Sequence, residues 1–231
     1  MMHCAMFDCG NVLVQLNMQE FYRFLRSHMS NPDILEPELI FLHLEPISDF
    51  DLGKIGVFQM FKRVKNTLDL NVGKNEFLAQ SARILNPDRK VVAIGQMLKK
   101  NGIKTAVISN TNNYHFEYLQ TAYPDVFAAF DYLMLSFQHG FKKPDHRMWE
   151  VPACHLDVSP EECFFVDDLK NNIIEFMKWG KGLGTAHHYD VSDDKLCPNG
   201  RLEEERNKLV MRMVNLAMLT PAQAESIILS P

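Results

Sequence analysis

The sequence lacks the cysteine pattern of a disulfide-bonded or zinc-binding protein. Its five cysteines are odd in number and widely separated, and no two of them form a CxxC pair. This spacing indicates reduced thiols and excludes a disulfide framework. The chain also lacks a basic stretch followed by an apolar stretch at its start, so no signal peptide is expected. These absences predict a cytoplasmic protein.

Long apolar runs and an excess of positive charge are absent as well. No uninterrupted apolar run reaches membrane-spanning length. The net charge of −5 argues against broad binding to nucleic acid or to an anionic membrane. The apolar content of 46% and the charged content of 23% are typical of a globular protein. At 231 residues the chain can bury a full core and carry a smaller insert.

Apolar runs alternate with helical periodicity in most of the chain. Strands are expected over residues 3–7, 105–108, 132–135, 163–166 and 185–188. Pro87 is expected to open a helix that ends at Asn101–Gly102. Strands separated by single helices predict an α/β fold, with a doubly wound parallel sheet. Between about residues 15 and 85 no strand alternation occurs, and the pattern predicts a small helical insert.

Polar side chains follow the predicted strands at the points where the strands end. Asp8 follows the first, Ser109–Asn110 the second, Lys143 the third and Asp167–Asp168 the fourth. Asp pairs and Ser-Asn turns are common in loops, so each cluster alone is weak evidence. Ligands of open parallel sheets bind beyond the carboxyl ends of the strands. The shared position of these clusters therefore predicts a functional site at one edge of the sheet.

The chemistry of these residues suits phosphoryl transfer. Asp8, Asp167 and Asp168 would concentrate negative charge that needs a cation, and oxygen ligands favour Mg²⁺. Ser109 and Asn110 can donate hydrogen bonds to phosphate, and Lys143 supplies a positive charge. A carboxylate nucleophile, a metal and these donors are the parts that an aspartyl-phosphate mechanism requires.

Four segments resemble the motifs of the haloacid dehalogenase (HAD) superfamily of hydrolases, which the chain resembles from about residue 3 to residue 190. They are Phe7-Asp8-Cys9-Gly10-Asn11-Val12, Ile108-Ser109-Asn110-Thr111, Gly140-Phe141-Lys142-Lys143-Pro144-Asp145 and Phe165-Val166-Asp167-Asp168-Leu169-Lys170-Asn171-Asn172. The resemblance implies a Rossmann-like core at residues 1–14 and 86–190 and a helical cap domain at residues 15–85. Residues 191–231 are expected to form a helical extension, packed on the core or at a homodimer contact.

The resemblance also implies a function and a role for each site residue. The first two motifs look most similar to bacterial sugar-1-phosphate phosphatases of the α-glucose-1-phosphate type, which implies hydrolysis of a small phosphorylated metabolite, with a sugar phosphate favoured. Asp8 would be the phosphorylated nucleophile, Lys143 would balance charge, and Ser109 would bind the phosphoryl group with Asn110 beside it. The implied magnesium ligands are Asp8, the Gly10 carbonyl, Asp167 and Asp168, with Asn172 behind them.

One position departs from the pattern of most phosphatases in this superfamily. They carry a second Asp, a general acid and base, where this chain has Gly10. General acid–base help is typically worth about 10²–10⁴-fold. Three explanations stay open: a leaving group that needs little protonation, a proton donor in the insert such as His28 or His43, or a phosphate-binding or interaction module without fast turnover. Two further alternatives are a haloacid dehalogenase, which the Asp167–Asp168 pair disfavours because dehalogenases need no Mg²⁺, and a nucleophilic Cys9.

Overall fold

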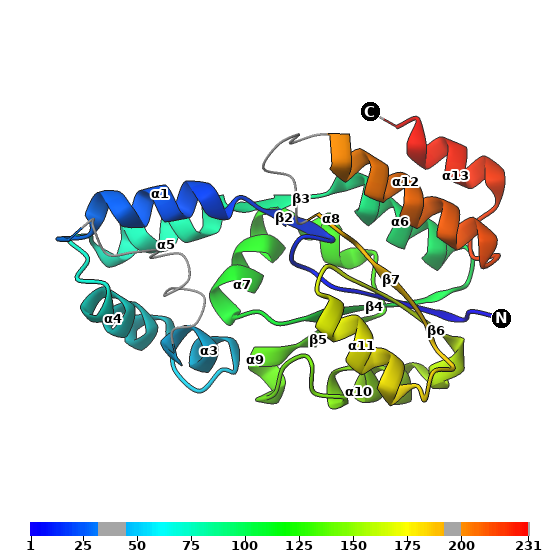
Figure 1. Ribbon diagram of the computed structural model, residues 1–231, viewed down its shortest axis with the longest axis horizontal. Helices are drawn as coiled ribbons and strands as arrows, with labels where there is room; N and C mark the ends of the chain where they lie inside the picture. Colours follow the sequence, from blue (N-terminus) through cyan, green and yellow to red (C-terminus); the bar gives the residue numbers. More distant parts are fainter. Residues whose placement is uncertain (32–44, 192–199, 231) are drawn as a thin grey trace.

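The centre of the molecule is a five-stranded parallel sheet with the strand order β5-β4-β1-β6-β7 (Figure 1). This computed structural model describes residues 1–31, 45–191 and 200–230. The strands are β1 (Cys4–Phe7), β4 (Lys104–Ser109), β5 (Tyr132–Leu135), β6 (Cys163–Asp167) and β7 (Thr185–His188). The predicted α/β fold is confirmed, and β5 and β7 have the predicted bounds.

Helices cover both faces of this sheet. Successive side chains of a strand point to opposite faces. Cys4 and Met6 therefore pack in one apolar cluster with α10 (Arg147–Leu156) and α11 (Lys170–Trp179). Ala5 and Phe7 belong to the cluster on the other face, which includes α6 (Arg89–Lys100). The remaining core helices are α7 (Asn113–Ala122), α8 (Pro124–Ala128), α9 (Ser136–His139) and the 3₁₀ helix η1 (Pro160–Glu162).

Two short strands lie at the ends of the insert, where the sequence predicted none. The expectation that Pro87 opens a helix is also wrong. β2 (Val14–Leu16) and β3 (Leu85–Pro87) form an antiparallel pair. Pro87 ends β3, and α6 begins at Arg89 with Asp88 as its N-cap, whose side chain accepts a hydrogen bond from the Val91 N–H. The β2–β3 pair brings the two ends of the intervening helical segment together.

The helices between β2 and β3, here called the helical insert, lie beside the sheet-bearing part of the molecule (Figure 1). In the described part of this segment they are α1 (Met18–His28), α3 (Glu45–Asp51), α4 (Val57–Thr67) and α5 (Lys74–Arg83). Phe21 of α1 and Phe77 of α5 are buried, with ring centroids 5.5 Å apart. Their apolar cluster is continuous with the cluster that contains α6. The proposed division of the chain into core and cap stays a prediction.

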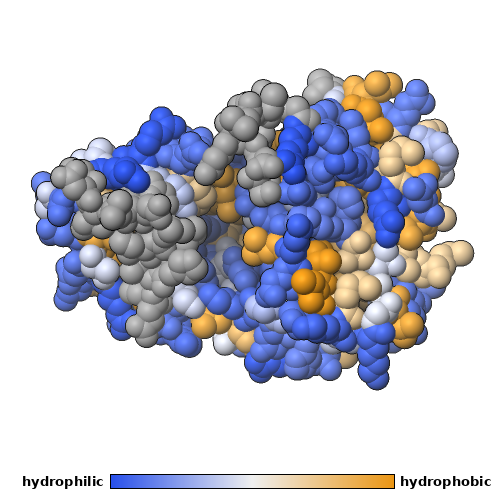
Figure 2. Space-filling model, in the orientation of Figure 1, coloured by the Kyte–Doolittle hydropathy of each residue, from blue (hydrophilic) through white to orange (hydrophobic). Residues whose placement is uncertain are grey.

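The C-terminal helices α12 (Gly200–Asn215) and α13 (Pro221–Ile228) lie beside α6 (Figure 1). Leu209, Val210 and Met213 of α12 are buried in the same cluster as α6. Arg206 also donates from Nε to the buried Asp88 carboxylate at 2.9 Å. The homodimer contact stays a prediction. The face shown in Figure 2 is mainly hydrophilic, and within the described ranges none of the helices is long and apolar enough to cross a membrane.

Candidate active site

The register of the sheet places the predicted polar residues at one edge. Phe7 of β1 is paired with Val107 of β4 and with Val166 of β6. All three strands run in the same direction, so the residues that follow them emerge at the same edge. The buried residues Asp8, Ser109 and Asp167 are there, at exposures of 7%, 2% and 0%.

Three carboxylates and one lysine form the centre of this edge. One oxygen from each of Asp8, Asp167 and Asp168 lies within 4.8 Å of the other two. The Lys143 ammonium lies 2.6 Å from Asp8 Oδ1 and 2.7 Å from Asp167 Oδ2. With every group ionised, a single positive charge faces three negative charges in a buried place. This cluster fits a metal site because its ligand atoms are oxygens and its negative charge exceeds what Lys143 neutralises.

The protonation of these groups reflects their burial and their shared charge. Burial raises the pKa of Asp8 well above its ordinary value, against the opposing effect of Lys143. Burial also raises the pKa of Asp168, against the hydrogen bond from Asn11. Burial acts to lower the pKa of Lys143, but the facing carboxylates of Asp8 and Asp167 raise it above its ordinary value. The carboxylates therefore favour the charged form of Lys143.

Amide donors hold the carboxylates in place. Asn172, from the first turn of α11, donates from Nδ2 to both oxygens of Asp167 at 2.9 and 3.0 Å. Asn11 donates from Nδ2 to Asp168 Oδ2 at 2.9 Å. Sequence reasoning missed Asn11, although its place after Gly10 in a turn was a signal. Its φ of +56° is one that asparagine tolerates better than most residues.

The Asn110 side chain is hydrogen-bonded to the backbone of Lys143, and its role beside the phosphate stays a prediction. Its Oδ1 accepts a hydrogen bond from the Lys143 N–H at 2.7 Å, and its Nδ2 donates to the Lys143 carbonyl at 3.1 Å. The side chain thus fixes the backbone that carries Lys143. Ser109, one residue earlier, lies at the end of β4 and lines a cavity together with Cys9 and Gly10.

Cys9 is held as a neutral thiol, and Gly10 has no side chain that could give a proton. Burial raises the pKa of the Cys9 thiol to about 12, so it is a neutral thiol at pH 7. Gly10 has no side chain, and a Cβ added there would lie 3.2 Å from Leu16 Cδ1. Leu16 therefore occupies the space beside the position where most phosphatases of the resembled superfamily carry an Asp.

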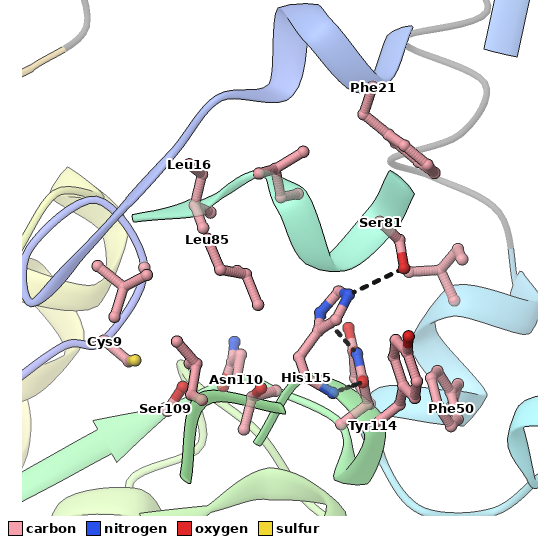
Figure 3. Close-up of a pocket in the computed structure, with 18 of the residues that line it drawn as sticks. Cys9, Leu16, Phe21, Phe50, Ser81, Leu85, Ser109, Asn110, Tyr114 and His115 are labelled. Atoms are coloured by element: carbon pink, nitrogen blue, oxygen red, sulfur yellow. Dashed lines mark hydrogen bonds between the residues drawn. The ribbon is translucent and has the colours of Figure 1, made fainter. Parts of the chain in front are cut away.

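The cavity beside Ser109 has a volume of about 190 Å³ and extends between the core and the helical insert. Figure 3 shows Cys9 and Ser109 at one end of it and Phe21 and Phe50 at the other. His28, a proposed proton donor, is not among its lining residues, and His43 lies outside the described residues. The titratable side chains that do line it include Asp51 and His115, neither of which the sequence singled out.

The polar residues of the cavity form a connected group. Asn112, the N-cap of α7, donates from Nδ2 to Asp51 Oδ1 at 3.1 Å and accepts at Oδ1 from the His115 N–H at 3.0 Å. His115 Nε2 lies 3.4 Å from Ser81 Oγ of the insert (Figure 3). Burial raises the pKa of Asp51 and lowers the pKa of His115 to about 4. His115 is therefore neutral at pH 7.

Comparison with known proteins identifies a matching family and related proteins. Residues 2–179 match the haloacid dehalogenase-like hydrolase family. The sesquiterpene phosphatase astK of Aspergillus oryzae is 25% identical over 173 residues, which are 74% of this chain and 82% of that protein. The mouse acyl-CoA dehydrogenase family member 10 is 36% identical over 81 residues, 35% of this chain, and the match spans 7% of the mouse protein's length.

Solved structures share the fold at low sequence identity. A predicted HAD-like hydrolase from Porphyromonas gingivalis has a TM-score of 0.70 at 19% identity, covering 86% of this chain and 95% of that one. An HAD family enzyme from Bacteroides thetaiotaomicron, in complex with magnesium and inorganic phosphate, has a TM-score of 0.69 at 17% identity, covering 84% and 98%.

Proposed function

Because the chain belongs to the haloacid dehalogenase-like hydrolase family, we propose that it is a magnesium-dependent phosphatase acting through a phosphorylated Asp8. The observation that carries this proposal is the buried Asp8 carboxylate, which lies 2.6 Å from Lys143 within a cluster of three carboxylates. The name of the Aspergillus relative and the magnesium and phosphate of the Bacteroides enzyme support it.

The donor set suits Mg²⁺. Asp8, Asp167 and Asp168 would hold the ion, together with the Gly10 carbonyl that the family resemblance implies. When bound, Mg²⁺ supplies positive charge that stabilises the transferring phosphoryl group. Asn172 and Asn11 keep the carboxylates of Asp167 and Asp168 oriented without adding charge. Magnesium is favoured over zinc because the described cluster offers only carboxylate oxygens.

Asp8, Lys143 and Ser109 have different roles in the reaction. An Asp8 carboxylate oxygen attacks phosphorus, and the bond from phosphorus to the ester oxygen breaks as the new bond forms. Lys143 stabilises charge on the phosphoryl oxygens, and the Ser109 hydroxyl donates a hydrogen bond to one of them. Water then attacks phosphorus and gives up a proton, which replaces the proton taken by the departing alcohol. Inorganic phosphate leaves, and the Asp8 carboxylate is restored. One ester and one water thus give one alcohol and one phosphate.

The departing alcohol needs a proton that Gly10 cannot give. We assign this proton to Asp51, a carboxyl group that lines the same cavity as Ser109. Burial favours the protonated form of Asp51, whereas His115 is neutral at pH 7 and therefore has no imidazolium proton to give. The alternative function, a phosphate-binding or interaction module with slow turnover, is favoured by the missing side chain at Gly10. The preference for a sugar phosphate stays a prediction.

The proposal is tested by release of phosphate from 4-nitrophenyl phosphate, whose leaving group needs little protonation. We expect release that depends on Mg²⁺, stops with a chelator, and falls by at least about 10³-fold in Asp8→Asn, because the nucleophile is lost. Asp157→Asn is the matched control. Asp157 is exposed and precedes β6, at the opposite edge of the sheet from the site.

The circular dichroism spectrum and the melting temperature of Asp8→Asn show whether the variant is folded. Full activity in folded Asp8→Asn would disprove the nucleophilic role. Absence of release from any ester by the wild-type protein would favour the binding module.

A further inference from the structure

The cavity of about 190 Å³ that begins at Ser109 has walls made largely of hydrocarbon side chains. The insert contributes Phe21 from α1, Phe50 from α3, Met60 from α4 and Phe77 from α5. All four are buried, with exposures of 7% or less. Figure 3 shows Leu16 and Leu85 along the wall between the Ser109 end and the Phe21 end. A group attached to a phosphate at Asp8 would extend along this wall.

Polar side chains are a minority of the residues that line the cavity. Among the described residues that line it, none is a lysine or an arginine. Some of its polar side chains already serve the protein: Ser81 donates from Oγ to the Leu78 carbonyl at 2.8 Å. Asn112 caps α7 and also donates to Asp51. A sugar placed here would lose water from several hydroxyls and would lie mostly against hydrocarbon side chains.

The volume of the cavity and the free energies of burying methylene and hydroxyl groups also favour a hydrocarbon ligand. A dry apolar cavity of about 150 Å³ accepts a benzene molecule, so this cavity has room for a hydrocarbon group of at least about six carbons. Each methylene that leaves water for an apolar wall strengthens binding by about fourfold. Each hydroxyl buried without a partner weakens binding by at least about fivefold. The wall thus selects for hydrocarbon and against polyols.

We propose that the substrates are phosphate monoesters of apolar alcohols, whose hydrocarbon part occupies this cavity while the phosphate lies at Asp8. This inference rests on the proposed phosphatase function and names its substrate class. The helical insert then acts as the recognition element, because it provides Phe21, Phe50, Met60 and Phe77.

The test compares n-butyl, n-hexyl and n-octyl phosphate with glucose 6-phosphate in the presence of Mg²⁺. All are esters of primary alcohols, so differences in kcat/KM report mainly on recognition and little on the leaving group. Hexyl phosphate and glucose 6-phosphate also have the same number of carbons. We expect kcat/KM to rise about fourfold per methylene until the cavity is filled, and hexyl phosphate to exceed glucose 6-phosphate by at least about 10²-fold, because several hydroxyls lack partners.

A variant pair connects this preference to the cavity. Met60→Gln puts an amide of similar size into the wall, whereas Met211→Gln changes a residue of α12 that is 50% exposed. The hexyl-to-butyl ratio of kcat/KM does not depend on how much enzyme is folded. We expect the ratio to fall severalfold in Met60→Gln and to stay unchanged in Met211→Gln.

Release from 4-nitrophenyl phosphate separates the two proposals. If it occurs while the alkyl series shows no dependence on length, or while glucose 6-phosphate is preferred, the substrate class is wrong and the phosphatase function stands. If no ester is hydrolysed by the wild-type protein, both are wrong. An unchanged hexyl-to-butyl ratio in folded Met60→Gln would overturn the assignment to this cavity.

Discussion

The stability of the fold should fall at acid pH because of His115. This residue is in the first turn of α7, where its backbone N–H donates to the N-cap Asn112. Its ring lies between Ser81 Oγ and Asn112 Nδ2, each at 3.4 Å. Neither neighbour carries a negative charge that would favour imidazolium. Burial therefore lowers the pKa of His115 from 6.5 to about 4.

The sign of the effect follows from the two pKa values. The unfolded chain binds a proton at His115 near pH 6.5, whereas the folded protein resists it down to about pH 4. The stability that His115 contributes is thus fully present above pH 6.5 and is lost as the pH falls through the folded pKa. Between pH 7.5 and pH 5.0 the loss amounts to at most about 2 kcal/mol, since one pKa unit corresponds to about 1.4 kcal/mol.

Urea unfolding at pH 7.5 and pH 5.0 measures this loss. We compare the wild-type protein with His115→Gln, which keeps a polar side chain and cannot titrate. The free energy of unfolding of the wild type should fall by about 1–2 kcal/mol more than that of the variant, because carboxylates elsewhere contribute equally to both. His146→Gln, at an exposed position, should behave like the wild type. Equal losses in the wild type and His115→Gln would refute the assignment.

Two further predictions concern Asp51 at the end of α3 and Gly53 in the loop that follows. Asp51→Asn should slow hydrolysis of hexyl phosphate by about 10²-fold or more and leave 4-nitrophenyl phosphate nearly unchanged, because only the alkyl leaving group needs the proton; equal slowing of both esters would contradict a proton donor. Gly53→Ala should cost about 1–3 kcal/mol more in urea unfolding than the control Gly102→Ala. Both glycines have positive φ, but only at Gly53 would a Cβ lie close to backbone, the Phe137 carbonyl oxygen; equal costs for the two variants would show that the close approach is unimportant.

The strands and the edge of the sheet were predictable because their signals are local. Tyr132–Leu135 and Thr185–His188 are short runs flanked by turns or helices, and their bounds were predicted without error. Because strands and helices alternate along the chain, the strands are expected to be parallel. Parallel strands end at a common edge of the sheet, which places Asp8 and Asp167 at the same edge. The order β5-β4-β1-β6-β7 then places β1 between β4 and β6.

The β2–β3 pair was not predictable in the same way. Each strand has three residues, too few for an alternation to be visible, and its partner lies about seventy residues away in the chain. The sequence predicts Pro87 as the first residue of a helix because proline is common there. In the structure, the side chain of Asp88 caps the helix, and its carboxylate also pairs with Arg206 of α12. That pairing is a tertiary contact, which local sequence does not reveal.

The cavity shows most clearly why chemistry was easier to infer than specificity. The carboxylates and Lys143 lie at strand ends or in the loops that follow, at one edge of the sheet, so the family resemblance could assign them in order. The cavity wall instead requires side chains from β2, β3 and four insert helices to meet. In sequence, Phe21, Met60 and Phe77 look like ordinary core residues at helical spacing, which is also what most of their contacts make them. What distinguishes them is an unfilled volume beside Ser109, and that property belongs to the packing of several elements. The sugar preference rests on two short motifs around Asp8 and Ser109, the residues to which the proposed function assigns the phosphate end of the substrate. The insert faces the other end, so the substrate class has to be argued from the shape and polarity of the cavity.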